Sequence, residues 1–205
     1  MLIAIEGVDG AGTTTQSRRL VDWLEARGRK AHLTREPSTG PIGALLREML
    51  GGRHAPVDKA ALALLFAADR LDHLAREIEP ARAAGAIVVS DRYVMSSLAY
   101  QSLDVPHEFV ARINERATAA DLTVLVDVPV EVAAERRRRR GGQLELFDAL
   151  EVQRQLVQAY RVEAARAQAA GHAVILVDGT PGEEEVFAQL CAAVARACAL
   201  TVSSS

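Results

Sequence analysis

Residues 7–14, which read Gly7-Val8-Asp9-Gly10-Ala11-Gly12-Thr13-Thr14, decide the fold of this chain. An apolar run, Leu2–Glu6, precedes them, and a helical pattern begins near Thr13. A strand, a glycine-rich loop and a helix in this order are typical of a Walker A loop, whose backbone N–H groups and helix dipole surround a phosphate. The glycine spacing does not fit a dinucleotide-binding fingerprint. We predict that all eight residues bind a nucleotide; the alternative is a glycine-rich turn without a ligand.

The loop departs from the Walker A pattern at one position, because Thr13 stands where lysine is expected. Lysine reaches the β- and γ-phosphates, whereas threonine offers only a short neutral donor. Losing one charge-assisted hydrogen bond costs about 1.5–3 kcal/mol of binding. If that contact tightens in the transition state, the loss is roughly 10²–10³ in rate. Thr14 keeps the hydroxyl that ligates Mg²⁺ in such loops.

Four more strand-like runs follow the first, and helical patterns separate them. The predicted strands are Ala31–Arg35, Ala86–Ser90, Leu122–Asp127 and Ala173–Asp178. The predicted helices are Thr13–Arg27, Pro41–Leu50, Val57–Ala84, Val94–Leu103, His107–Ala119, Val130–Arg140, Asp148–Ala170 and Glu183–Ala199. Strands with continuous rather than alternating apolar residues are typical of a buried parallel sheet. The alternation predicts an α/β fold: a doubly wound, five-stranded parallel sheet between two helical layers, in one domain of residues 1–200 with a frayed tail at 201–205.

The composition excludes several classes of protein. The 205 residues include 24 Lys+Arg and 27 Asp+Glu, for a formal net charge of -3, which does not favour binding to nucleic acid. Apolar runs are far shorter than the roughly 20 residues of a membrane span, and the start of the chain lacks a basic signal-peptide segment. The two cysteines, Cys191 and Cys198, are too far apart on one helix to bond to each other. We expect a reduced, cytoplasmic protein that binds neither nucleic acid nor membrane.

Two groups of residues have patterns that suit a phosphorylated substrate. Asp91 and Arg92 follow an apolar run, as in a Walker B arrangement, so the carboxylate would hold Mg²⁺ and the arginine a phosphoryl group. The alternative is a helix N-cap with an exposed arginine. Phe66 and Arg70 share a helix face and suit a base and a phosphate, although a core phenylalanine and a solvated arginine fit as well.

A run of five arginines, Arg136–Arg140, stands before Gly141 and Gly142. A cationic helix end beside a glycine hinge can close over phosphates and stabilise the charge that is transferred. We predict a mobile lid over about residues 136–148. The alternative is a solvated helix end that the helix dipole favours.

Four ordered motifs resemble those of bacterial thymidylate kinases (dTMP kinases), which are P-loop nucleoside monophosphate kinases. They are Glu6-Gly-Val-Asp-Gly-Ala-Gly12, Thr34-Arg-Glu-Pro37, Leu65-Phe-Ala-Ala-Asp-Arg70 followed by His73, and the run from Asp91-Arg-Tyr93 through Ser96-Ser97 to Ala99-Tyr-Gln101. The resemblance extends from Ile3 to about Leu176. It implies the strand order 2-3-1-4-5 and a homodimer.

The resemblance assigns roles to residues whose pattern alone leaves them open. It implies that Phe66 stacks on the thymine ring and that Ser97 and Gln101 recognise the pyrimidine. From the sequence alone, these two polar residues, four apart on a helix, could equally face water. Tyr100 would pack against the deoxyribose, where a 2′-hydroxyl would clash.

The phosphate-binding roles follow from the same resemblance. Arg70 would hold the monophosphate, and Arg92 would approach the acceptor phosphate. Asp9 would contact the sugar 3′-hydroxyl and the catalytic centre, while Glu36 and Pro37 would line the pocket.

The implied activity is phosphorylation of dTMP to dTDP with ATP and Mg²⁺, in the synthesis of dTTP. Thr14 and Asp91 would organise Mg²⁺, and the catalytic arginines would come from the lid: Arg137, Arg138, Arg139 and Arg140. We hypothesise that one of these four replaces the charge that Thr13 lacks. The alternatives are a kinase for another nucleotide or deoxynucleoside, and a non-catalytic nucleotide-binding or regulatory protein that lost activity with the lysine.

Overall fold

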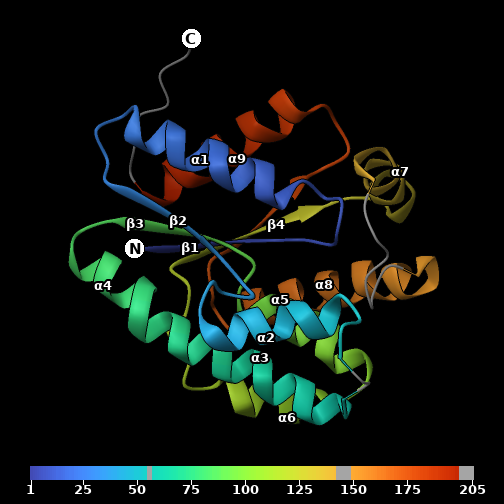
Figure 1. Ribbon diagram of the computed structural model, residues 1–205. Helices are drawn as coiled ribbons and strands as arrows, with labels where there is room; N and C mark the ends of the chain where they lie inside the picture. Colours follow the sequence, from blue (N-terminus) through green and yellow to red (C-terminus); the bar gives the residue numbers. More distant parts are fainter. Residues whose placement is uncertain (55–56, 142–148, 199–205) are drawn as a thin grey trace.

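The computed structural model describes residues 1–54, 57–141 and 149–198, and in this part of the chain five parallel strands form one sheet (Figure 1). They are β1 (Leu2–Glu6), β2 (Ala31–Arg35), β3 (Ile87–Asp91), β4 (Leu122–Asp127) and β5 (Val174–Asp178). Their order is β2-β3-β1-β4-β5, with β1 between β3 and β4. The predicted parallel sheet and its strand order are confirmed.

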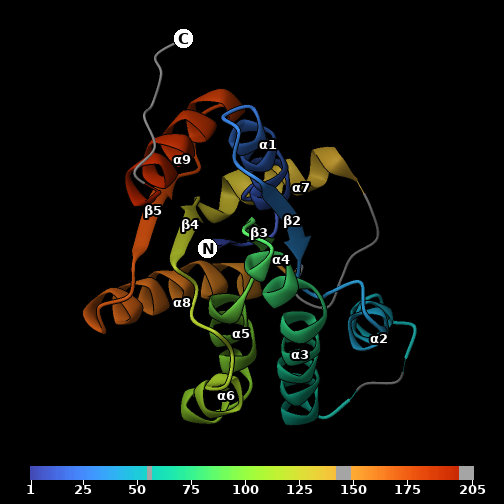
Figure 2. The ribbon, with the colours of Figure 1, turned by 90° about the vertical axis from the view of Figure 1, so that its left-hand side faces the viewer.

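Helices cover both faces of the sheet, which parallel strands require because both of their faces are apolar. One face carries α1 (Thr13–Glu25) and α9 (Glu183–Ala197), which lie above the sheet in Figure 1. The opposite layer, best seen in Figure 2, contains α2 (Pro41–Leu50), α3 (Lys59–His73), α4 (Glu79–Ala83), α5 (Val94–Tyr100), α6 (His107–Asn114) and α8 (Leu150–Ala169). The helix α7 (Val130–Arg140) lies beyond the end of the sheet to which the strands point (Figure 1).

The central strand β1 explains why the apolar runs are continuous. Ile3 and Ile5 are fully buried in a core cluster that includes Leu20 of α1, whereas Leu2 and Ala4 pack in a second cluster with Ile78. Successive side chains of a strand point to opposite faces, so a strand covered on both sides needs apolar residues at every position. No helix in the described residues is long and apolar enough to span a membrane.

Several predicted boundaries are wrong by short distances. The strand β3 runs one residue later than predicted and ends at Asp91, which therefore belongs to the strand. The predicted helix Val57–Ala84 is divided, because a π-helical turn at Leu74–Ile78 separates α3 from α4. Pro80 gives the physical reason: it lacks an N–H and its ring would clash with the carbonyl of an α-helical turn, so the backbone widens before it.

Other predicted helices are shorter in the structure. The helix α1 ends at Glu25, α5 ends at Tyr100 and continues as a 3₁₀ turn over Gln101–Leu103, and α6 ends at Asn114. The predicted segments 142–148, within the lid, and 201–205, the tail, lie outside the described residues.

Candidate active site

The glycine-rich loop leaves the carboxyl end of β1 and enters α1 at Thr13, as its sequence predicts. Gly10 has a φ of 91°, and a Cβ there would overlap the carbonyl oxygen of Ala133 in α7. Only glycine allows this backbone conformation and this close approach together. The loop and α7 therefore lie in direct contact, which brings the arginines of α7 near the loop.

A cavity of about 380 Å³ opens over this loop. Six of the eight predicted nucleotide-binding residues line it, together with the first turn of α1, three arginines and three residues around the start of α9. The full lining is Asp9, Gly10, Ala11, Gly12, Thr13, Thr14, Thr15, Gln16, Arg92, Arg136, Arg137, Pro181, Glu183 and Val186. Gly7 and Val8 were predicted to bind the nucleotide but do not line this cavity, and Val8 is buried in the core. We call this space the donor cavity.

A second pocket adjoins the first, and all nine residues that the resemblance assigned to substrate binding line it. They are Asp9, Glu36, Pro37, Phe66, Arg70, Arg92, Ser97, Tyr100 and Gln101. Leu50 of α2 and Ser96 of α5 complete the wall. We call this space the acceptor pocket. Its residues come from α2, α3, α5, the 3₁₀ turn after α5 and the segments that follow β1, β2 and β3, so the fold assembles it from parts far apart in the sequence.

Arg70 lies at the inner end of the acceptor pocket and is only 2% exposed. Its Nε and Nη2 donate to Oε2 of Glu36 at 2.9 and 2.6 Å. Further hydrogen bonds go to the Ser97 hydroxyl at 3.1 Å and to the side-chain oxygen of Asn114. A buried arginine that contacts a buried carboxylate is held in one orientation. The alternative prediction of a solvated Arg70 is wrong, whereas Phe66, one turn away on α3, lines the pocket half-buried.

Glu36 owes its position to β2 and β3. The segment continues the ladder beyond β2, since the Glu36 N–H donates to the Asp91 carbonyl at 3.0 Å. The following Glu36–Pro37 peptide bond is cis. His73, at the end of α3, contacts the other Glu36 oxygen at 3.4 Å and Thr34 at 2.7 Å. The carboxylate that orients Arg70 is thus fixed from both the sheet and α3.

Asp9 and Arg92 line both cavities and form the wall between them. Arg92 Nη2 donates to Asp9 Oδ1 at 2.7 Å, and the Tyr100 hydroxyl donates to Asp9 Oδ2 at 3.0 Å. Burial favours a raised pKa for Asp9, but Arg92, the Tyr100 hydrogen bond and Arg137 outweigh it and lower the pKa of this carboxyl. Asp9 is therefore ionised near neutral pH.

The backbone of Arg92 is strained. Its φ of 73° makes it the one non-glycine residue with a positive φ in the described residues. Such a conformation costs about 1–3 kcal/mol and persists only where the surroundings enforce it. Arg92 Nη1 donates to the Gly7 carbonyl at 3.0 Å, to the Tyr160 hydroxyl at 3.0 Å and to Ser96 at 3.3 Å. These contacts hold the guanidinium of Arg92 in its place between the two cavities.

The residues predicted to organise Mg²⁺ lie together at the ends of β3 and the loop. The Thr14 hydroxyl donates to Asp91 Oδ2 at 2.5 Å. Asp91 Oδ1 is buried and has no hydrogen-bond partner in the described part of the chain. A buried carboxylate oxygen without a donor, beside a hydroxyl, fits a hard cation that takes oxygen ligands. Mg²⁺ needs few protein ligands when substrate phosphates and water supply the others.

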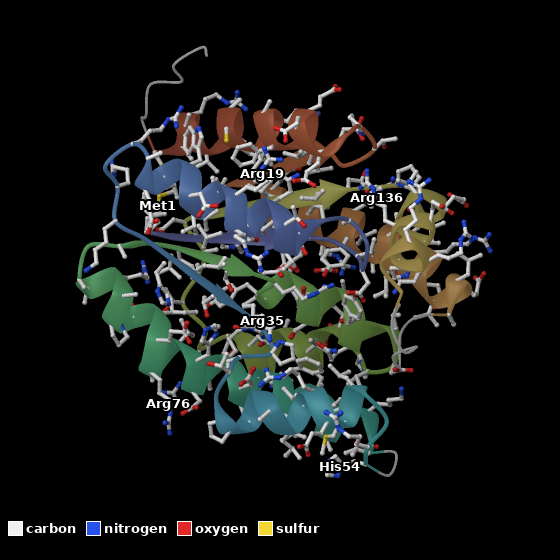
Figure 3. The ribbon with its side chains drawn as sticks, turned by 45° about the horizontal axis from the view of Figure 1, so that its top comes forward. Met1, Arg19, Arg35, His54, Arg76 and Arg136 are labelled. Carbon is white, nitrogen blue, oxygen red and sulfur yellow. The ribbon has the colours of Figure 1, made fainter. Side chains whose placement is uncertain are left out.

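The described arginine side chains of α7, Arg136–Arg139, differ in what they contact. Arg137 lines the donor cavity and donates to the Asp9 carbonyl at 2.5 Å and to Gln153 Oε1 at 3.1 Å. Arg136, which was not among the predicted catalytic residues, also lines it and donates to the Thr180 and Pro181 carbonyls at 3.3 and 3.0 Å. Figure 3 shows the side chain of Arg136 on α7.

The next two arginines of the run are more exposed. Arg138 and Arg139 have side chains 77% and 78% exposed and pair with Glu135. They do not line the donor cavity. The side chain of Arg140 lies outside the described residues. Besides Arg92, the predicted catalytic arginines are Arg137–Arg140, and among their described side chains Arg137 alone lines the donor cavity.

Sequence reasoning missed several residues that line the two cavities: Leu50 and Ser96 in the acceptor pocket, and Thr15, Gln16, Arg136, Pro181, Glu183 and Val186 in the donor cavity. It also missed Gln153 and Tyr160, which contact Arg137 and Arg92. Ser96 belongs to a quoted motif and Arg136 to the arginine run, so both had a signal. Leu50 and Tyr160 had none, since an apolar helix end and a single tyrosine in a long helix predict only packing.

The fold and the paired cavities define a class of protein. A parallel sheet with β1 in the centre, a phosphate-binding loop after β1 and a second pocket that shares Asp9 and Arg92 are typical of a P-loop nucleoside monophosphate kinase.

The chain belongs to the thymidylate kinase family, whose model, described as "Thymidylate kinase", matches residues 5–190. A probable thymidylate kinase of Pyrobaculum aerophilum is 42% identical over 197 residues, which are 95% of this chain and 96% of the relative. A probable thymidylate kinase of Thermococcus kodakarensis is 41% identical over 170 residues, which are 78% and 82% of the two chains. Because these relatives are archaeal, the expected bacterial kind of thymidylate kinase is not confirmed.

Proposed function

We propose that this protein transfers the γ-phosphate of ATP to dTMP, giving dTDP. The observation that carries the proposal is the meeting of two cavities at Asp9 and Arg92: one over a phosphate-binding loop, the other lined by the nine assigned acceptor residues. Membership of the thymidylate kinase family and the names of its relatives support dTMP as the acceptor.

In this proposal the acceptor nucleotide occupies the pocket between α3 and α5. Phe66 stacks on the thymine ring, and Ser97 and Gln101 recognise the pyrimidine. Tyr100, whose hydroxyl contacts Asp9, packs against the deoxyribose. Glu36 and Pro37 close the pocket, and Glu36 orients Arg70 toward the monophosphate.

The transfer is an in-line attack by an acceptor phosphate oxygen on the γ-phosphorus of ATP. The chain supplies positioning and positive charge rather than covalent chemistry. Arg92 stands between the cavities and neutralises negative charge on the transferred group. Thr14 and Asp91 are the residues that would hold Mg²⁺. When bound, Mg²⁺ neutralises charge on the phosphates.

We further propose that Arg137, with Arg136, supplies the cationic charge that the loop lacks at Thr13. Both side chains line the donor cavity beside Thr13, whereas Arg138 and Arg139 point away from it. Two cations in the donor cavity also disfavour the alternative of a nucleotide-binding protein that lost activity with its lysine.

A coupled assay with ATP and dTMP tests the activity on the wild type and on Thr13→Lys. We expect turnover by the wild type and less than about a tenfold gain from the lysine, because a charge is already present. If the wild type shows no turnover and Thr13→Lys restores it, the proposal that Arg136 and Arg137 replace the charge of the missing lysine is overturned. A panel of other nucleoside monophosphates and deoxynucleosides under the same conditions distinguishes dTMP kinase from a kinase for another acceptor.

The oligomeric state of the protein is a further proposal. We propose a homodimer on the family resemblance, and two exposed leucines of α3, Leu64 and Leu71, lie two turns apart on one face and support an interface there. Light scattering on wild type and Leu64→Glu tests it, with loss of the dimer expected in the variant.

We propose a single kinase domain over residues 1–200 with a lid at 136–148. We also propose that the protein works in the cytoplasm, where its two cysteines stay reduced.

A further inference from the structure

Three polar side chains of α8 are buried, Gln153, Tyr160 and Glu163, although a helix can cover a sheet with apolar residues alone. Glu163 pairs with His107 and Arg166, away from the two cavities, whereas the other two face the site. Gln153 and Tyr160 are 0% and 1% exposed. They lie two turns apart, so they share one face of α8, on which Leu156 and Val157 are also buried. A buried polar group costs free energy unless it finds a partner, so the partners of these two side chains matter.

The partners of Tyr160 surround the guanidinium of Arg92. The Tyr160 hydroxyl accepts from Arg92 Nη1 at 3.0 Å and lies 2.7 Å from the Ser96 hydroxyl. It also donates to Glu6 Oε2 at 3.4 Å, a fully buried carboxylate that accepts from Ser96 as well. The ring of Tyr160 meets that of Tyr100 edge-on, with centroids 6.0 Å apart. This network holds one edge of Arg92 from the α8 side.

Among the described residues, Gln153 contacts the arginine of α7 that lines the donor cavity. Gln153 Oε1 accepts from Arg137 Nη1 at 3.1 Å, and the same Nη1 donates to the Asp9 carbonyl at 2.5 Å. Arg92 meets the side chain of Asp9, and Arg137 meets its backbone. One helix face therefore reaches two arginines that converge on a single residue.

We propose that α8 is a positioning element of the active site, in which Gln153 holds Arg137 and Tyr160 holds Arg92 on the two sides of Asp9. Neither residue is among those that line the donor cavity or the acceptor pocket in the described part of the chain, so both act through the arginines. Its kinetic consequences rest on the proposed dTMP kinase activity. Because Gln153 and Tyr160 lie two turns apart on one helix, α8 then fixes the distance between the two arginines on either side of Asp9.

Single variants with matched controls test the two contacts. Tyr160→Phe removes the hydroxyl beside Arg92, and Gln153→Leu removes the amide beside Arg137. Tyr93→Phe and Gln168→Leu are the controls, since the Tyr93 hydroxyl donates to the Thr118 carbonyl and Gln168 donates to the Val174 carbonyl. We expect kcat to fall about tenfold or more in each test variant, because each loses a hydrogen bond to a charged group, and less than about twofold in the controls.

A split between the Michaelis constants separates positioning from general loss of structure. Tyr160→Phe should raise the KM for dTMP more than that for ATP, and Gln153→Leu should do the reverse. Equal changes in both constants, or losses of kcat that the controls share, would overturn the proposal. The double variant should lose less than the product of the single losses, since both arginines meet at Asp9. Losses that multiply would show that the two contacts are independent.

A measurement without substrates keeps this inference distinct from the proposed activity. Nitrogen NMR of ¹⁵N-labelled arginine reports rotation about the Cζ–Nη bonds, which hydrogen bonds slow. We expect faster rotation at Arg92 in Tyr160→Phe and at Arg137 in Gln153→Leu, with the other arginine changed less. Unchanged rotation would overturn the role of α8. A wild type that shows slow rotation yet no turnover of dTMP would overturn the proposed function alone.

Discussion

The acceptor pocket and the donor cavity share Asp9 and Arg92 but hold their cations by different means. In the acceptor pocket, carboxylates orient the arginines: the buried Glu36 fixes Arg70, and the half-buried Asp9 fixes Arg92. At the donor cavity the arginines come from α7, and backbone carbonyls are among their partners.

This difference indicates where the chain places its fixed charge. The acceptor pocket is built from the sheet and from helices packed on it, so its charges are set when the core forms. The donor loop itself carries no cation at position 13, and a helix outside the loop brings the charge to it. Under the roles proposed for Arg136 and Arg137, the positive charge comes from a neighbouring helix while the loop backbone keeps its conformation.

The residue common to both cavities should give the largest effect. Arg92→Ala removes the guanidinium that lines both the donor cavity and the acceptor pocket, so under the proposed mechanism we expect kcat to fall about 10³-fold. Steady-state kinetics with ATP and dTMP check this. Arg92→Lys keeps a charge but not the planar fork, and it should recover only part of the rate. A fall below tenfold in the alanine variant would mean that the two cavities do not meet at Arg92 in function.

A pair of neighbouring substitutions tests the donor side. Arg137→Ala should lower kcat about 10²-fold, because it removes a cation from the donor cavity, whereas Arg138→Ala should change it less than about twofold. The second side chain is 77% exposed and pairs with Glu135. Equal losses in both variants would contradict the assignment of charge to one face of α7, and wild-type turnover in both would exclude these two arginines as the replacement for lysine.

The acceptor side can be tested through stability as well as through binding. Glu36→Gln leaves Arg70 buried beside a neutral group, so we expect the free energy of unfolding to fall by about 3 kcal/mol in urea titrations. Glu184→Gln is the control, since Glu184 pairs with Arg19 at 2.6 Å but is 85% exposed, and we expect a change below about 1 kcal/mol. Similar changes in the two variants would show that Arg70 is not held by a buried ion pair.

The smallest effect concerns the pH dependence of stability at Asp9. The pKa of Asp9 in the folded protein is lowered from 3.8, so the carboxylate stabilises the fold above that value and loses this contribution as the pH falls through its folded pKa. We expect Asp9→Asn to flatten the acid side of the curve of unfolding free energy against pH, below about pH 4. Curves of equal slope for the two proteins would indicate that Arg92 and Arg137 do not stabilise this carboxylate.

The fold was predictable because its three central strands, β1, β3 and β4, are largely buried on both sides. A strand such as β1 needs apolar residues at every position, and that pattern is visible without any knowledge of partners. The end of β3 was predicted one residue early because Asp91 is polar, and polarity at a strand end does not distinguish strand from loop. The break at the π-helical turn was missed because the apolar pattern continues across it, although Pro80 marked the place.

The site was predictable in part, and the limits have physical causes. The acceptor residues were assigned through family resemblance, since spacing alone left Phe66 and Arg70 open. Which arginine of α7 faces the donor cavity depends on how α7 crosses the loop, and the contact of Gly10 with Ala133 sets that in three dimensions. The contact of Arg92 with Tyr160 joins residues 68 positions apart, so no local pattern could indicate it.

At Arg92, the strained backbone lowers the stability of the fold, while the side chain is proposed to serve the activity. Glycine adopts a φ of 73° without the steric cost that arginine bears, although it is more flexible in the unfolded chain. Selection for thermal stability alone would favour replacement of Arg92, whereas selection for phosphoryl transfer would retain it. Thermostability screens without an activity screen are therefore expected to enrich inactive variants at residue 92, and stabilising substitutions for this enzyme are better sought elsewhere.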